Sequence, residues 1–99
     1  MTQFSEETKQ KIAELCKRHK VRELSLFGSR SRGDETPGSD FDLLVEFLPD
    51  ADIGLIEYSR MQIDLSEVLQ TKVDLVSKRW LNKRIRDRVL SDAKPIYEA

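Results

Sequence analysis

An alternation of apolar and polar residues from Phe41 to Phe47 is the feature that most restricts the fold of this chain. One face of this extended segment carries Phe41, Leu43, Val45 and Phe47, and the other carries Asp42, Leu44 and Glu46. Pro49 and Asp50 end the run. A strand with one strongly apolar face needs partner strands and a covering layer, so we expect a sheet built around it.

The rest of the chain divides into helical and extended patterns. Apolar residues recur at helical spacing over 5–19, 55–69 and 80–91, and extended patterns cover 21–27 and 72–77. Ser5 is a typical helix N-cap, and Pro95 is expected to close the regular structure. The resulting order of elements predicts an α+β fold of two layers, a small mixed sheet with helices on one side.

Length and composition set the scale of the molecule. The 99 residues include 17 basic and 18 acidic side chains, for a formal charge of −1, and 38% are hydrophobic. These values predict one domain spanning 1–99 and exclude the composition of disordered chains. Because no run approaches the roughly 20 apolar residues that span a bilayer, we expect a cytoplasmic protein with no membrane partner.

Three side chains that often serve in catalysis or binding have structural interpretations here. Cys16 lies beside Leu15 on an apolar helical stripe, so we expect it to pack in the core. His19 has no second His or Cys at ligand spacing, which predicts a surface or helix-end position. Trp80 is expected in the core.

A group of acidic residues lies at the start of the second predicted strand and within the third. Asp40 and Asp42 are two residues apart in an extended segment, so both carboxylates point to the same face and can share a cation. Oxygen ligands of this kind suit Mg²⁺, which is typically completed by substrate phosphates. Asp74 lies in the third strand and would add a third carboxylate if the two strands are neighbours, and three carboxylates suggest two metal ions.

The segment after the first strand has the features of a phosphate-binding turn. Gly28 leaves backbone N–H groups accessible, Ser29 offers a hydroxyl, and Arg30 and Arg32 offer guanidinium groups. A triphosphate could bridge this turn and the carboxylates. The chemistry predicted from these residues is in-line nucleotidyl transfer.

The sequence Gly28-Ser29, ten residues, then Asp40-x-Asp42 resembles the signature of the minimal nucleotidyltransferases (MNT) of the DNA polymerase beta superfamily. The run Val73-Asp74-Leu75-Val76 is similar to the strand that bears the family's third acid. The resemblance implies that Asp40, Asp42 and Asp74 are catalytic and bind two Mg²⁺ ions, with Gly28, Ser29 and Arg32 at the nucleotide. It implies further that Asp74 deprotonates the acceptor hydroxyl.

Domains of this size resemble the antitoxin member of HEPN/MNT toxin–antitoxin pairs. The resemblance implies that ATP is the substrate and that AMP is transferred to a tyrosine of a HEPN-domain toxin. Two alternatives remain open at this point: an antitoxin that neutralises its partner by binding alone, and a nucleotidyltransferase of small molecules such as antibiotics.

The charge is distributed unevenly along the chain. Residues 78–99 hold seven basic and three acidic side chains, with most of the basic ones between 78 and 88. This segment could form a solvated helix face or dock an acidic partner. The overall negative charge and the absence of interleaved aromatic residues argue against direct binding of nucleic acid.

Overall fold

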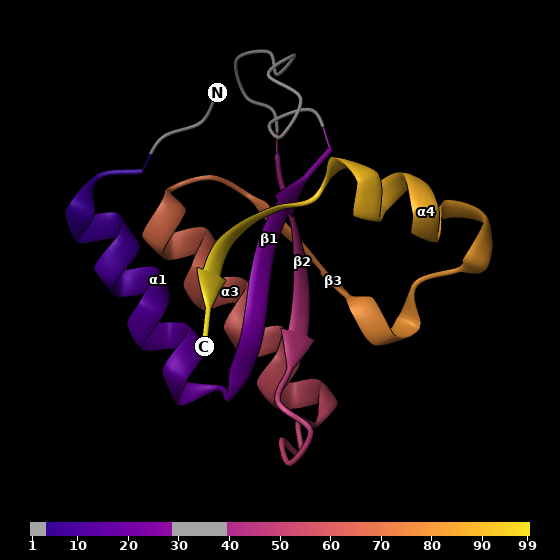
Figure 1. Cartoon of the computed structure of the whole chain (residues 1–99). Helices are drawn as coiled ribbons and strands as arrows, with labels where there is room; N and C mark the ends of the chain where they lie inside the picture. The colour runs from indigo at the N-terminus through magenta and orange to yellow at the C-terminus, as the bar shows by residue number, and fades with distance from the viewer. Residues whose placement is uncertain (1–3, 29–39) are drawn as a thin grey trace.

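The computed structural model of the chain describes residues 4–28 and 40–99 (Figure 1). In chain order the elements are α1 (Glu6–Arg18), β1 (Val21–Phe27), β2 (Phe41–Phe47), α3 (Leu55–Leu69), β3 (Val73–Ser77), the short 3-10 helix η1 (Lys78–Trp80), α4 (Lys83–Asp92) and β4 (Lys94–Glu98). The elements predicted from residue 5 to residue 77 are confirmed with small shifts at their ends.

The four strands form one mixed sheet in the order β3-β2-β1-β4. β1 pairs antiparallel with β2 and with β4, whereas β2 pairs parallel with β3. The mixed sheet and the α+β class predicted from the sequence are therefore confirmed. β2 and β1 are the two internal strands, in agreement with the sheet that we expected around the apolar pattern of β2.

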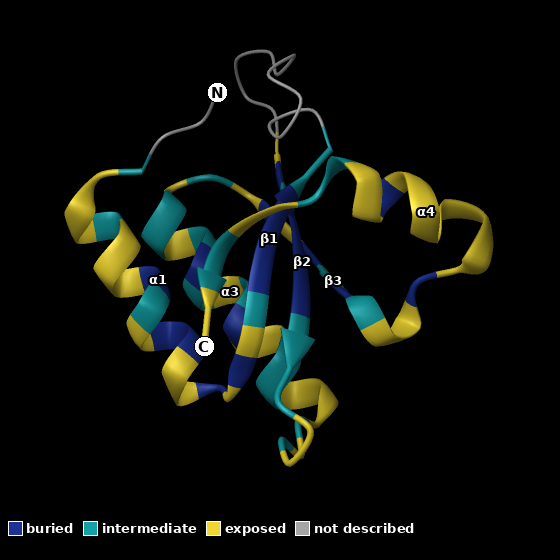
Figure 2. Cartoon of the chain, viewed as in Figure 1, coloured by how far each residue is buried: buried dark blue, intermediate teal, exposed yellow. Residues whose placement is uncertain are grey.

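The main core lies between the sheet and the helices α1 and α3, on the left of the sheet in Figure 1. Ile12 and Cys16 of α1 and Met61 and Leu65 of α3 are buried against the strands. Figure 2 shows buried residues on the sides of these helices that face the sheet. The core position predicted for Cys16 is confirmed.

The arrangement of all helices on one side needs a correction, because α4 packs on the other face. Leu44 of β2 forms a second, smaller cluster there with Leu81 and Val89. Val76 and Phe27 are half-buried against the same cluster. Leu44 interrupts the polar face of β2 with an apolar side chain, and this side chain requires a cover of its own.

The helix predicted near 80–91 is observed as α4, which begins three residues later than expected and ends one residue later. Lys78–Trp80 forms η1, and α4 begins after Asn82, whose side chain accepts a hydrogen bond from Arg84 N at 2.9 Å. An Asn at this position is a strong N-cap, so it fixes the start of the helix. Trp80 was expected in the core but is 67% exposed, which contradicts that expectation.

Two further expectations are corrected by contacts between distant segments. Pro95 does not close the regular structure but lies inside β4, an edge strand, where a residue without an N–H group is tolerated. His19 is at the helix end, as predicted, but it is buried, with Nδ1 3.0 Å from Oε2 of Glu57 in α3. None of the helices in the described parts of the chain has the length and apolar character that a bilayer crossing requires.

Candidate active site

Asp42 and Asp74 lie side by side on neighbouring strands. They are register partners in the parallel pair of β2 and β3, so both side chains leave the same face of strands that run about 4.8 Å apart. The adjacent residues Leu43 and Leu75 point the other way and are buried in the main core. The condition that the sequence left open, that these two strands are neighbours, is met.

Gly28 at the end of β1 makes room for the Asp42 carboxylate. Its φ of +75° lies in the left-handed region that glycine adopts without strain. A Cβ placed on Gly28 would lie 2.3 Å from Oδ2 and 3.2 Å from Cγ of Asp42. Any other residue would therefore displace the carboxylate, and this steric constraint adds to the requirement for glycine at the turn.

Asp40 precedes β2 and is part of an ion pair. Its Oδ2 lies 3.9 Å from Nζ of Lys72, and both side chains are substantially exposed. The backbone holds the two residues in this position, since Phe41 N donates a hydrogen bond to Lys72 O at 3.0 Å. The sequence reasoning did not identify Lys72, because its proximity to Asp40 depends on the pairing of β2 with β3.

Side chains of α3 hold the edge strand β3 that carries Asp74. Ser66 Oγ accepts a hydrogen bond from Val73 N at 3.1 Å, and Gln62 Oε1 accepts one from Leu75 N at 3.0 Å. The hydroxyl of Tyr58 donates to Leu75 O at 2.5 Å. Tyr58, Gln62 and Ser66 are spaced four residues apart on one face of α3. This one helix face therefore supplies hydrogen-bond partners to backbone groups on the outer edge of β3.

The surroundings of β3 change the pKa of Tyr58. Burial raises the pKa of the Tyr58 phenol, and the negative charge of Asp74 raises it further. Tyr58 therefore stays protonated and remains a hydrogen-bond donor at neutral pH. The sequence placed Tyr58 on an amphipathic helix and gave no signal of its link to β3.

The donor chemistry of this edge fits a magnesium ion. Mg²⁺ in phosphate-binding sites is commonly held by one or two protein carboxylates, with waters and substrate phosphates completing its shell. Asp42 and Asp74 supply such a pair on one face, where Asp42 is half-buried and Asp74 is exposed. In the described residues, no group of three or more His, Cys, Asp or Glu side chains is gathered closely enough to hold a metal ion.

Two residues of the predicted site lie outside the described residues. These are Ser29 and Arg32, both expected at the nucleotide phosphates. Of the predicted site, the structure thus places Gly28, Asp42 and Asp74 together, with Asp40 at the start of the same strand as Asp42.

The chain is similar to known proteins in sequence and in fold. A family model described as a nucleotidyltransferase domain matches residues 8–96. A Methanocaldococcus jannaschii protein that bears a protein adenylyltransferase name is 34% identical over 87 residues, covering 88% of this chain and 91% of that protein. The protein adenylyltransferase MntA of Thermococcus cleftensis is 37% identical over 81 residues, covering 80% and 78%. A crystal structure of a toxin–antitoxin with AMP-PNP is similar with a TM-score of 0.74 at 27% identity, covering 92% of this chain and 73% of that one.

Proposed function

Because this chain belongs to the nucleotidyltransferase domain family, we propose that it transfers AMP from ATP to a hydroxyl group of a partner protein. The observation that carries the proposal is the pair Asp42 and Asp74, in register on one face of the sheet, with Gly28 against the Asp42 carboxylate. Relatives named as protein adenylyltransferases that match most of the chain support a protein as the acceptor. The reaction would take place in the cytoplasm, where ATP is supplied.

Each acidic residue has a separate part in the proposed reaction. Asp42 and Asp74 would hold Mg²⁺, and Asp40 would join them once it leaves its contact with Lys72. The family resemblance implies two ions, which would neutralise charge at the triphosphate. Asp74 would also accept the proton of the acceptor hydroxyl. Gly28 keeps the Asp42 carboxylate in place, and Ser29 and Arg32 remain the predicted contacts of the phosphates.

The chemical step forms one bond and breaks one. The acceptor oxygen bonds to the α-phosphorus of ATP, the bond from that phosphorus to the bridging oxygen breaks, and pyrophosphate leaves. A tyrosine hydroxyl has a pKa near 10, so it needs a base such as the Asp74 carboxylate at neutral pH. Asp74 is exposed, which leaves it accessible to a side chain of another protein.

We propose a HEPN-domain toxin as this acceptor and a tyrosine as the modified residue. The similarity to a toxin–antitoxin structure that contains an ATP analogue supports this pairing. The modification would inactivate the toxin, so the chain would act as its antitoxin.

The test is to incubate the protein with ATP, MgCl₂ and the HEPN protein encoded beside it, and to measure the mass of the HEPN protein. We expect a mass increase of whole AMP units with the wild type and none with Asp42→Asn. Asp50→Asn, which changes an exposed acid in the turn after β2, is the matched control and should be fully active. A HEPN protein that stays unmodified but is neutralised equally well by Asp42→Asn would instead establish an antitoxin that acts by binding.

A further inference from the structure

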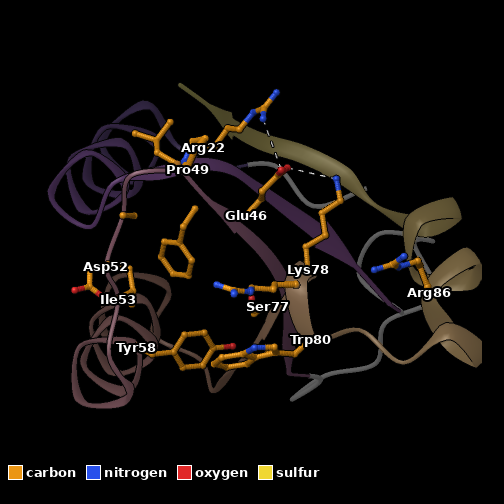
Figure 3. Close-up of a pocket in the computed structure, with 14 residues that line it drawn as sticks. Arg22, Glu46, Pro49, Asp52, Ile53, Tyr58, Ser77, Lys78, Trp80 and Arg86 are labelled. Carbon is orange, nitrogen blue, oxygen red and sulfur yellow. Dashed lines mark hydrogen bonds and ion pairs between the residues drawn. The ribbon is translucent and has the colours of Figure 1, made fainter.

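A cavity of about 520 Å³ opens at the carboxyl ends of β2 and β3 (Figure 3). Its lining includes Tyr58 of α3, Trp80 of η1, and Arg86 of α4. Ser77, which ends β3 at this cavity, is three residues from Asp74, or about 10 Å along the strand. The cluster of Leu44, Leu81 and Val89 packs against the sheet between the two acids and this end. We call the cavity the Trp80 pocket.

Trp80 is an exposed aromatic residue held in a defined position. Its ring centroid lies 5.8 Å from that of Tyr58, with a tilt of 47° between the planes. Tyr58 is itself fixed by its hydrogen bond to Leu75 O, so Trp80 packs on a rigid neighbour. Figure 3 shows the two rings side by side at the edge of the cavity. A large, ordered and accessible aromatic ring of this kind is typical of an anchor point in protein interfaces.

The cations around Trp80 differ in their pairing. Arg22 and Lys78 both approach the carboxylate of Glu46, at 3.8 and 3.4 Å, and so are partly neutralised. Arg79 and Arg86 line the same pocket, are exposed, and form no ion pair with another described residue. The pocket therefore presents two guanidinium groups without an ion-pair partner among the described residues, together with an exposed aromatic ring, which favours a ligand with carboxylates and an apolar side chain.

We propose that the Trp80 pocket binds an acidic segment of the acceptor protein, an inference that rests on the proposed function. An apolar side chain of this segment would pack on Trp80, and its carboxylates would pair with Arg79 and Arg86. Asp42 and Asp74 lie on the sheet, and a separate surface beside them can select the acceptor. The end of the pocket at Ser77 lies about 10 Å along β3 from Asp74, so a hydroxyl a few residues away along a segment bound there can reach the acid. Docking raises the effective concentration of this hydroxyl at the acids.

The composition of the pocket favours a protein over a nucleic acid as this ligand. Glu46 and Asp52 also line the pocket, and the whole chain has a net charge of −1. The lining holds four basic side chains against these two acids, so its surplus of positive charge suits one or two carboxylates, whereas proteins that bind nucleic acid usually have a strongly basic domain. Trp, Tyr and Arg, by contrast, are the residues most enriched where interfaces between proteins gain their binding energy.

The test compares pocket variants in binding and in transfer to the HEPN protein. Trp80→Ala is expected to raise the dissociation constant about 30-fold, the usual loss for a central aromatic anchor. Arg86→Ala should raise it about fivefold, whereas Arg88→Ala, which removes an exposed cation of the same helix outside the pocket, should change it less than about twofold. All three variants should retain the turnover number of the wild type at saturating HEPN protein, so that the loss is confined to KM.

Each alternative result has a defined meaning. If the wild type neither binds nor modifies the HEPN protein, the proposed function fails. If the wild type modifies it and Trp80→Ala has an unchanged KM, the proposed function stands and the docking role of the pocket is wrong. Trp80 is the one tryptophan of the chain, so its fluorescence also tests the other ligand class. Quenching by a twelve-residue oligouridylate at micromolar concentration would overturn the protein assignment in favour of RNA.

Discussion

The two faces of the sheet differ in how many apolar residues they bury and in whether they carry the candidate catalytic acids. The face under α1 and α3 contains thirteen buried residues of the main core, including Leu24, Leu43 and Leu65. Among the described residues, the cluster under α4 has three buried apolar members, Leu44, Leu81 and Val89, and the same face carries Asp42 and Asp74. A residue contributes to one face or the other according to its parity along β2 and β3. Substitutions of adjacent residues in one strand should therefore have different effects, one lowering activity and the other lowering the free energy of unfolding.

The largest expected effect is on the acidic face. If the proposed reaction is right, Asp42→Asn and Asp74→Asn should each lower the rate of AMP transfer at least about 1,000-fold, or about 4 kcal/mol of transition-state stabilisation, because each variant removes a charged ligand of the proposed Mg²⁺. The free energy of unfolding in urea should stay within about 0.5 kcal/mol of the wild type. Transfer that persists in both variants would show that the acids are not the reactive site.

On the apolar face, the effect should fall on folding. Leu65→Ala should lower the free energy of unfolding by about 3 kcal/mol, since Leu65 is fully buried in the main core. Val89→Ala in the smaller cluster should cost about 1 kcal/mol, because that cluster has fewer neighbours to lose. Urea denaturation of both variants measures how much free energy of unfolding each one loses. Equal losses would contradict the larger contribution of the main core to stability.

The edge strand β3 contributes residues to both faces of the sheet. Loss of one of its hydrogen bonds to α3 should lower the free energy of unfolding measurably. Gln62→Ala leaves Leu75 N without its acceptor and should lower the free energy of unfolding by about 2 kcal/mol. Glu67→Ala, an exposed substitution on the same helix, is the control and should cost less than about 0.5 kcal/mol. Hydrogen exchange of Leu75 N should also accelerate in Gln62→Ala and not in the control.

A smaller effect should follow from the protonation of Tyr58. Its pKa is raised in the folded protein by burial and by Asp74, whereas unfolded tyrosine ionises near pH 10. The stabilising contribution is therefore complete below pH 10 and is lost as pH rises from 10 through the folded-state pKa. The free energy of unfolding measured between pH 8 and 11 should fall less steeply in Tyr58→Phe, and parallel curves would contradict the coupling.

The smallest effect concerns the thiol of Cys16 in the main core. Burial raises its pKa to about 12, so it stays protonated and inert in the folded chain at pH 8. A thiol reagent such as iodoacetamide should label Cys16 at the rate of global unfolding, as mass spectrometry can follow. Rapid labelling in the absence of denaturant would mean that the α1 side of the core opens locally.

Much of the main core could be predicted from local patterns, and the smaller cluster could not. The alternation in β2 and the helical spacing of α1 and α3 depend on residues close together in sequence, so they can be identified without the fold. β4 escaped prediction because it carries Pro95 and forms only by pairing with β1, about seventy residues earlier. Trp80 was assigned to the core by its residue type, but the Asn82 cap begins α4 after it and leaves its ring exposed.

The sequence by itself determined which residues of the candidate site are acidic, which glycine precedes them, and that Asp42 lies on the polar face of a strand, because composition and a period of two are local properties. The tertiary structure alone decided that β3 lies beside β2, which sets Asp74 in register with Asp42 and brings Lys72 to Asp40. It also decided that Gly28 packs against the Asp42 carboxylate and that Trp80 and Arg86 line one pocket. These placements join segments separated in the chain, and their geometry is fixed by hydrogen bonding between strands and by packing of helices on the two faces of the sheet.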